Sequence, residues 1–193
     1  MVQMKHRVCP WWLGYWLLNP LRKMGQNPHE LLLPYVHEGM TVLEPGPGMG
    51  FFTLELARLV GPSGRVVALD VQPKMIEKLK RRLAKAGMNG RVDTRVTSAE
   101  SMELSDLRST VDFSLAFAVV HEFPDPEKFF AEVGEASRPG ALLLLAEPKG
   151  HVKTAAFEAE LEAARKGGFE IKERPPIRHG QAALLKKVAT AAN

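Results

Sequence analysis

The sequence predicts an α/β fold built on a doubly wound, seven-stranded and mostly parallel sheet. From residue 41 onward, short apolar runs alternate with segments of helical period, which is typical of a parallel sheet covered by helices. The segment 141–146 is apolar at every position, as a strand buried on both faces has to be. Near the C-terminal end, two strand-like segments follow each other with only a loop between them, so we expect an antiparallel hairpin there.

Turn and capping residues divide the first half of this core. Strands are expected at 41–44, 65–70 and 91–97, because each run is apolar or β-branched and is followed by a break. A helix is expected over 52–60, where Gly61-Pro62 stops the pattern. A second helix begins at Pro73, buries a stripe that includes Leu79, and ends at Gly87. The charged side chains of this helix at 78–82 are interpreted as a solvated face.

The second half repeats the alternation and then departs from it. A strand is expected from Val111 to about Ala118, and Asp125-Pro126 is interpreted as the N-cap and first turn of a helix that Arg138-Pro139-Gly140 closes. A strand at 141–146 and a helix ending before Gly167-Gly168 follow. The closing hairpin is expected to pair 169–172 with 182–188.

Residues 1–40 lie outside the alternation, and we interpret them as an N-terminal helical cap of the same domain, with 41–193 as the core. Asn27-Pro28 is expected to start a helix that buries Leu31, Leu32 and Tyr35. An aromatic cluster at 11–16 contains all three tryptophans. Our hypothesis is that the cap closes over the site and contributes to an apolar acceptor pocket, although core packing also explains these aromatic residues.

Composition restricts the class of protein. The chain has 193 residues with 45% hydrophobic and 25% charged side chains, which excludes a largely disordered chain. A formal net charge of +4, spread along the chain, does not by itself indicate nucleic-acid binding. The one cysteine, Cys9, excludes an internal disulfide and a multi-cysteine zinc site, and we expect no metal. No apolar run is long enough to span a bilayer, and a cytoplasmic location is expected.

The most informative motif is the glycine-rich stretch Glu44-Pro45-Gly46-Pro47-Gly48-Met49-Gly50. In a strand–turn–helix unit, such glycines let a ligand approach the backbone, and the following helix presents free N–H groups. The third glycine of the dinucleotide fingerprint is absent, because Phe51 stands at its position. Glu44 is a poor neighbour for a pyrophosphate and a good one for an ammonium group. A plain tight turn remains the alternative.

Two further segments extend this motif. Asp70 ends the second strand, where a carboxylate accepts hydrogen bonds from the two ribose hydroxyls of a nucleoside, although an acid at this position also serves as a helix cap. Thr97-Ser98-Ala99-Glu100 follows the third strand, where an adenine edge would lie.

On these residues the chain resembles the class I S-adenosylmethionine-dependent methyltransferases, and in particular the small-molecule branch that includes quinone-biosynthesis enzymes. The stretch 44–50 is similar to the first motif of that family, 112–123 to its fourth-strand motif and 141–148 to its fifth-strand segment. The resemblance covers about residues 28–190. Many members of the family carry an acid where this chain has Ser98.

The resemblance implies a cofactor, S-adenosyl-L-methionine, with S-adenosyl-L-homocysteine as product, and a role for each matching residue. Glu44 would lie near the methionine ammonium, Asp70 would bind the ribose, and Val71 would pack on adenine. The glycines of the turn, Gly46, Gly48 and Gly50, would lie under the methionine and ribose parts of the cofactor. Ser98 and Ala99 would contact the adenine edge, and Ala116 and Phe117 would line the methionine end.

His121 is the candidate catalytic residue, since it follows the fourth strand beside the expected methyl group. A general base is needed only for an acceptor that is protonated at the working pH, and a structural histidine is the alternative. His151 and His179 lie in turns where they would be able to touch a substrate. The identity of the small-molecule acceptor, the attacking atom and the oligomeric state cannot be predicted from the sequence.

Other functions stay open. A nicotinamide-dependent oxidoreductase on a related fold is the second hypothesis, opposed by Phe51, Glu44 and the closing hairpin. A non-catalytic S-adenosylmethionine-binding module would have the same motifs. Nucleic acid is a disfavoured acceptor, because the stretch Phe117-Ala118-Val119-Val120 replaces the Asn/Asp-Pro-Pro-aromatic motif of enzymes that methylate base amino groups, and the chain shows no basic stripe.

Overall fold

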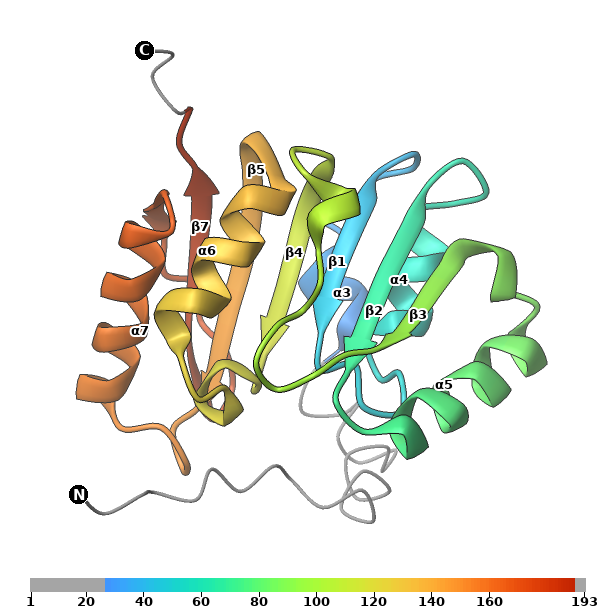
Figure 1. Cartoon of the computed structure of the whole chain (residues 1–193), viewed down its shortest axis with the longest axis horizontal. Helices are drawn as coiled ribbons and strands as arrows, with labels where there is room; N and C mark the ends of the chain where they lie inside the picture. Colours follow the sequence, from blue (N-terminus) through green and yellow to red (C-terminus); the bar gives the residue numbers. More distant parts are fainter. Residues whose placement is uncertain (1–26, 190–193) are drawn as a thin grey trace.

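The structure, a computed structural model, describes residues 27–189 and contains the predicted seven-stranded sheet (Figure 1). The strand order is β3-β2-β1-β4-β5-β7-β6. The first five strands in the chain are parallel, whereas β7 pairs antiparallel with both β5 and β6. The fold class and the closing hairpin are therefore as predicted. The strands are β1 (Thr41–Pro45), β2 (Arg65–Asp70), β3 (Val92–Val96), β4 (Val111–Phe117), β5 (Ser137–Pro148), β6 (Phe169–Glu173) and β7 (Gly180–Lys187).

Helices cover both faces of the sheet. The helices are α3 (Pro28–Leu32), α4 (Thr53–Leu59), α5 (Pro73–Ala86), α6 (Pro126–Ala136) and α7 (Thr154–Lys166), with short 3₁₀ turns η2 (Asn89–Arg91), η3 (Ser105–Leu107) and η4 (Val120–Glu122). One apolar cluster unites the sheet with α3, α4 and α5, and a second unites it with η3, α6 and α7. In Figure 1, α6 and α7 lie in front of the sheet and α4 lies behind it. Within residues 27–189, no helix is long and apolar enough to cross a membrane.

Local sequence signals explain several element ends. The Asp125 side chain accepts a hydrogen bond from the Lys128 amide at 3.0 Å, so the predicted N-cap of α6 is confirmed. Gly87 ends α5 in the left-handed region, at φ +68°.

The junction between α6 and β5 differs from the prediction. The helix ends at Ala136, before Arg138-Pro139-Gly140, and the strand starts at Ser137 instead of Ala141. The Ser137 hydroxyl donates to the Val133 carbonyl oxygen at 2.8 Å, which satisfies the last helical turn while the chain enters the sheet. The Arg138 side chain forms an ion pair with Asp112 at 2.7 Å, which holds this start of the strand beside β4.

The segment before β1 is helical over a shorter stretch than predicted, because α3 ends at Leu32. Leu32 is buried, whereas Leu31 and Tyr35 are half-buried, and Tyr35 lies beyond the helix with its ring stacked against Phe113. The rest of the predicted cap, including Cys9 and the aromatic cluster at 11–16, lies outside the described residues.

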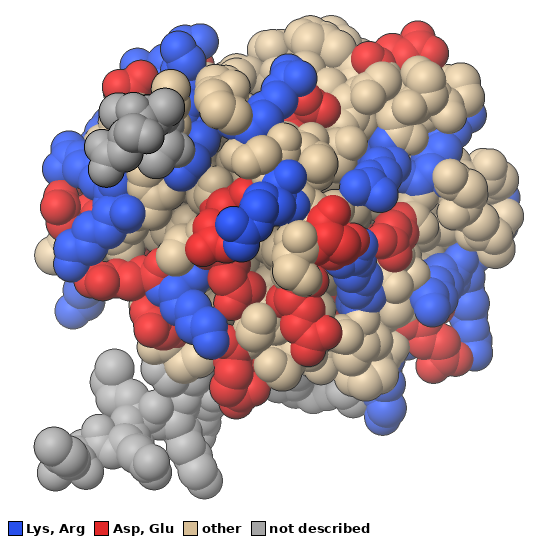
Figure 2. Space-filling view, turned by 45° about the horizontal axis from the view of Figure 1, so that its top comes forward, with Lys and Arg blue, Asp and Glu red and all other residues tan. Residues whose placement is uncertain are grey.

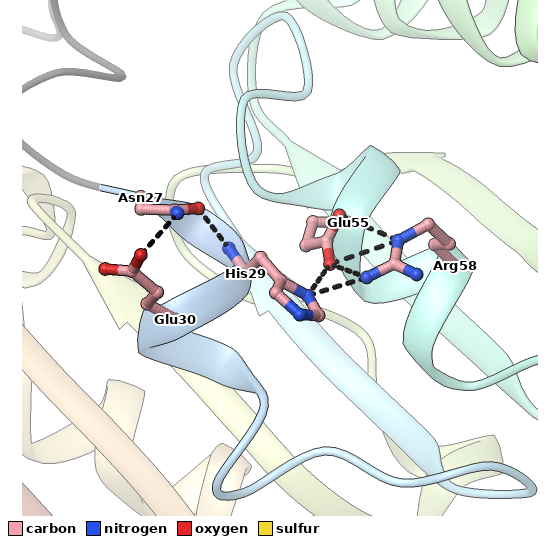
Figure 3. A network of polar contacts seen from close by, with 5 residues as sticks. All are labelled: Asn27, His29, Glu30, Glu55 and Arg58. Carbon is pink, nitrogen blue, oxygen red and sulfur yellow. Dashed lines mark hydrogen bonds and ion pairs between the residues drawn. The ribbon is translucent and has the colours of Figure 1, made fainter.

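A polar network attaches α3 to α4 (Figure 3). Asn27 caps α3 by accepting from the His29 amide at 3.0 Å, and its side-chain amide donates to Glu30 at 2.9 Å. The His29 Nδ1 lies 2.7 Å from a Glu55 carboxylate oxygen, and Arg58 donates to the same carboxylate. These contacts fix the direction from which the chain enters the fold.

Gly134, whose backbone angles are ordinary, lies where α6 closely approaches the end of α7. A Cβ on Gly134, within α6, would lie 2.3 Å from the Gly167 carbonyl oxygen at the end of α7. The two helices therefore approach each other at a point where only glycine fits.

We predict that Gly134→Ala lowers the free energy of unfolding by about 1–3 kcal/mol or more, the cost typical of overpacking, since a backbone atom has to move. Urea denaturation followed by circular dichroism measures the change. Gly90→Ala is the matched control, because nothing lies within 4 Å of a Cβ at that position. Equal midpoints for Gly134→Ala and the control would contradict the prediction.

Candidate functional site

The main candidate site is a cavity at the carboxyl ends of β1, β2 and β4, along the lower edge of the sheet in Figure 1. The chain leaves β1 toward the face that carries α4 and leaves β4 toward the face that carries α6. Neighbouring strands whose connections go to opposite faces open a crevice between them, and ligands of doubly wound folds bind at this position.

The glycine turn after β1 forms the floor of the cavity. All three glycines have positive φ, +67° at Gly46, +54° at Gly48 and +82° at Gly50. A Cβ on Gly46 would lie 2.5 Å from Val119, and one on Gly50 would lie 2.5 Å from Leu79, so both are required by packing as well as by φ. Gly48 has nothing within 4 Å of its Cβ position and lines the cavity. This position leaves space for a ligand.

Glu44 places a carboxyl group in the wall at the end of β1. Its side chain is buried, and its Oε2 has no hydrogen-bond partner among the described residues. Burial raises the pKa of Glu44 to about 8, and the neighbouring Thr53 hydroxyl offsets only part of this effect. A buried, unpartnered carboxyl group facing a cavity is suited to a cationic ligand group, which would restore its charge.

Asp70 lies at the end of β2 and also lines the cavity. The Gln72 amide donates to its Oδ1 at 2.8 Å, which fixes the side chain. Burial raises the pKa of Asp70, while the backbone amides of Gln72, Gly48 and Val71 act in the opposite direction. The helix-cap alternative for this residue is wrong, because the N-cap of α5 is Gln72 and no side chain of the described residues makes a capping hydrogen bond there. The place of Asp70 in the lining of the cavity is compatible with the ligand function.

Arg82 has a structural role that differs from the predicted solvated face. Its guanidinium group donates to the carbonyl oxygen of Met49, in the middle of the glycine turn. Burial lowers the pKa of Arg82, and the side chain reaches from α5 across to the loop. Charge composition alone did not separate Arg82 from its neighbours Lys80 and Arg81, which are both exposed.

The structure brings seven of the ten predicted cofactor-site residues to the cavity: Glu44, Gly46, Gly48, Asp70, Val71, Ala99 and Phe117. Three do not line it. Gly50 packs on α5, and Ala116 points into the apolar cluster beneath α6, because side chains alternate along β4. The Ser98 hydroxyl accepts from the amides of Glu100 and Ser101 at 3.2 and 3.1 Å, within its own loop.

Sequence reasoning missed the aromatic wall of the cavity. Phe51 and Phe52 lie directly before the first residue of α4 and line the cavity. The ring centroids of Phe52 and Phe117 are 4.6 Å apart. Phe51 was noted only because it replaces a glycine. Because aromatic rings and two carboxyl groups share one lining, the cavity offers apolar surface for a flat or aliphatic ligand part and acceptors for polar groups.

The loop after β4 has a strained start. Ala118 has φ +55°, an uncommon conformation for a residue with a side chain, and its amide donates to the Ala146 carbonyl oxygen at 2.7 Å. This bend carries Val119 over the glycine turn and is followed directly by η4, which contains His121.

His121 lies beside the cavity and does not line it, whereas the next residues, Glu122 and Phe123, do. Its Nδ1 is 2.6 Å from a carboxylate oxygen of Glu147, at the end of β5. The ring of His151 stacks on it with the centroids 6.3 Å apart. The hydrogen bond to Glu147 raises the pKa of His121, and burial opposes the rise. His179 lies in the turn before β7, with φ +58°.

Several known proteins are similar to this chain. Residues 36–183 match the family model described as "Methyltransferase domain". A ubiquinone biosynthesis O-methyltransferase of Methylocella silvestris is 34% identical over 130 residues, which is 67% of this chain and 48% of that protein. The ubiquinone/menaquinone biosynthesis C-methyltransferase UbiE of Hydrogenovibrio crunogenus is 29% identical over 138 residues, 69% of this chain and 54% of that protein. The chain thus spans about half the length of these curated relatives.

The fold is also that of a solved methyltransferase. The crystal structure of an S-adenosylmethionine-dependent methyltransferase from Aquifex aeolicus superposes with a TM-score of 0.82, covering 94% of this chain and all of that one at 24% sequence identity. This likeness concerns the arrangement of strands and helices.

The buried carboxyl group of Glu44 should make stability depend on pH. The pKa of Glu44 is about 8 in the folded protein, whereas its ordinary value is 4.5. The contribution of this carboxyl group to stability is therefore fully present below about pH 4.5 and is lost as the pH rises through 8. Relative to Glu44→Gln, the wild type should lose up to about 4 kcal/mol of unfolding free energy between pH 5 and 9, from about 1.4 kcal/mol per pH unit.

Urea denaturation of both proteins across this pH range measures the difference, and the other titrating groups are common to both. Parallel stability curves would show that the Glu44 carboxyl group is not perturbed.

Proposed function

The chain belongs to the methyltransferase domain family, and from that premise we propose that it transfers the methyl group of S-adenosylmethionine to a small-molecule acceptor and leaves S-adenosylhomocysteine. The observation that carries the proposal is the buried carboxyl group of Glu44, whose Oε2 has no partner among the described residues, in the same cavity as the open position at Gly48. An ammonium group fits the first, and a ligand in contact with the backbone fits the second.

We assign the binding residues by their chemistry. Glu44 would bind the ammonium group of the methionine part, and the carboxylate of Asp70 would accept from the ribose hydroxyls. Val71 and Ala99 would contact the adenine, while Phe117 would pack against the methionine end. Gly50, Ser98 and Ala116 would act indirectly, by shaping the turn, the adenine loop and the β4 strand.

S-adenosylmethionine supplies a methyl group on a positively charged sulfonium, which an acceptor receives by in-line displacement. The protein therefore has to hold the acceptor in line and exclude water, and positioning supplies most of the acceleration. The aromatic wall of Phe51, Phe52 and Phe117 serves the second requirement, because it covers one side of the cavity with apolar surface.

A small-molecule acceptor fits the surface better than a nucleic acid does. Lys and Arg side chains are interspersed with Asp and Glu on the face shown in Figure 2, and that face has no continuous basic stripe. Many of the arginines in the described part of the chain are engaged in ion pairs, including Arg95 with Asp106 and Arg108 with Glu135. The relatives whose printed names specify quinone biosynthesis support the same class of acceptor.

Calorimetric titration with S-adenosylmethionine, S-adenosylhomocysteine and NADH tests the cofactor. We expect saturable binding of the first two and none of NADH. Asp70→Asn should weaken both by about 10- to 100-fold, the loss typical of a hydrogen bond to a charged group. Asp93→Asn, on the exposed side of β3, is the matched control and should bind like the wild type. Binding of NADH alone would make the site a divergent dinucleotide site, and no binding at all would overturn the proposal.

We further propose His121 as the general base and expect His121→Ala to lower turnover by about 100-fold or more without changing the affinity for S-adenosylmethionine, because general-base catalysis contributes of that order. Steady-state kinetics together with calorimetry separate the two quantities. The exposed His37, changed to Ala, is the control. Unchanged turnover of His121→Ala would remove the residue from the mechanism.

A further inference from the structure

A second cluster of titratable side chains lies beside the cavity, where β4 and β5 end. Glu147 is at its centre, with a fully buried side chain. One of its oxygens accepts from the amides of Val120 and His121, at 2.9 and 3.4 Å, and the other lies 2.6 Å from the His121 Nδ1. The carboxyl group thus contacts both the backbone and the ring of the same histidine.

This geometry fixes the ring and its tautomer. With both carboxylate oxygens acting as acceptors, the Nδ1 carries the proton that it donates to Glu147. The Nε2 then has a free lone pair, and no hydrogen bond of this atom occurs within residues 27–189. The side chain of His121 is 26% exposed, and the residues that follow it, Glu122 and Phe123, line the cavity.

We propose that Glu147 is a positioning residue that holds His121 as the proton acceptor for a hydroxyl group, so that the methyl acceptor is an oxygen acid of the phenol type. The proposal rests on the proposed function and deepens it. A phenol hydroxyl, with an ordinary pKa of about 10, keeps its proton at neutral pH and has to lose it to a base during the attack, which is the task that a carboxylate–histidine pair performs. An already ionised acceptor, or one that attacks with a free lone pair, needs no base.

The transfer step balances with these groups. The acceptor oxygen forms a bond to the methyl carbon while the carbon–sulfur bond breaks, and the electron pair of that bond stays on sulfur. The hydroxyl proton passes to the His121 Nε2. The ring becomes a cation beside the Glu147 carboxylate, which stabilises it, and it later returns the proton to solvent through its exposed part.

A second buried carboxyl group interacts electrostatically with Glu147. Glu160, on α7, is buried with its Oε2 unpartnered, and burial together with the Glu147 charge raises its pKa to about 8. Glu160 is thus mainly neutral at pH 7. The carboxyl groups of Glu147, Glu122 and Glu160 favour the protonated form of His121, and burial of the ring opposes it. The ring of His151, stacked on His121, is a further titratable neighbour.

The first test is a titration of the His121 ring by NMR in the protein without acceptor. In the wild type we expect its midpoint above the ordinary value for histidine, about 6.5, and in Glu147→Gln a midpoint at lower pH. Glu158→Gln removes a carboxylate from the exposed face of α7 and is the matched control. Circular dichroism and S-adenosylhomocysteine binding check that each variant is folded, and Glu147→Asp provides a second variant if Glu147→Gln is not. The same midpoint in all proteins would overturn the positioning role.

The second test measures methyl transfer to alkyl-substituted phenols whose hydroxyl pKa values range from about 10, that of tyrosine, down to about 7. We expect His121→Ala and Glu147→Gln to lose at least tenfold in kcat on the most basic phenols and progressively less on those ionised at the assay pH. The rising limb of the pH–rate profile should also move to lower pH in Glu147→Gln.

The outcomes separate the two proposals. An equal loss across the series would reduce Glu147 to a structural role. If S-adenosylmethionine binds and no phenol in the series is methylated, the assignment of the acceptor class is wrong and the proposed function stands. If S-adenosylmethionine does not bind, the proposed function fails, and this inference fails with it.

Discussion

The reversal of the chain between β1 and α4 is the constraint on which the site depends. Its three glycines adopt conformations that other residues avoid, and two of them are enclosed, by Val119 from the loop after β4 and by Leu79 from α5. The turn is also hydrogen-bonded to β2 through the Gly46 amide and the Leu69 carbonyl oxygen, at 2.9 Å. Because it contacts each neighbouring element, a small displacement of the turn would move every wall of the cavity.

The site is built at some cost to stability. Glu44 and Glu160 are buried carboxyl groups with unpartnered oxygens, and burial raises the pKa of both to about 8. A protein selected only for stability would bury apolar groups at these positions, since an unpaired buried carboxyl group opposes folding. Two large apolar clusters, one on each face of the sheet, offset that cost. Such groups at the carboxyl edge of the sheet are more easily explained by ligands than by folding.

Most of the fold follows from local patterns, and most of the exceptions involve partners distant in sequence. Alternation, caps and glycine stops predicted the strands and the closing hairpin, with small shifts at their ends. The start of β5 was misplaced, because Pro139-Gly140 is tolerated where Ser137 already pairs with Val111. The contact of Arg82 with the Met49 carbonyl oxygen joins residues 33 positions apart, and no local pattern distinguishes that arginine from its charged neighbours.

The same reasoning explains why the sequence indicates the cofactor more clearly than the acceptor. The residues assigned to the cofactor follow β1, β2 and β3 and belong to short motifs, in which neighbours along the chain are also neighbours in the site. The proposed acceptor side draws on η4 and the end of β5, and His121 and Glu147 meet through the pairing of β4 with β5. The sequence did contain one signal, Glu147, which directly follows the apolar run 141–146. A charged residue at the carboxyl end of a central parallel strand is already at the ligand edge of the sheet, and the strand order then determines which histidine it contacts.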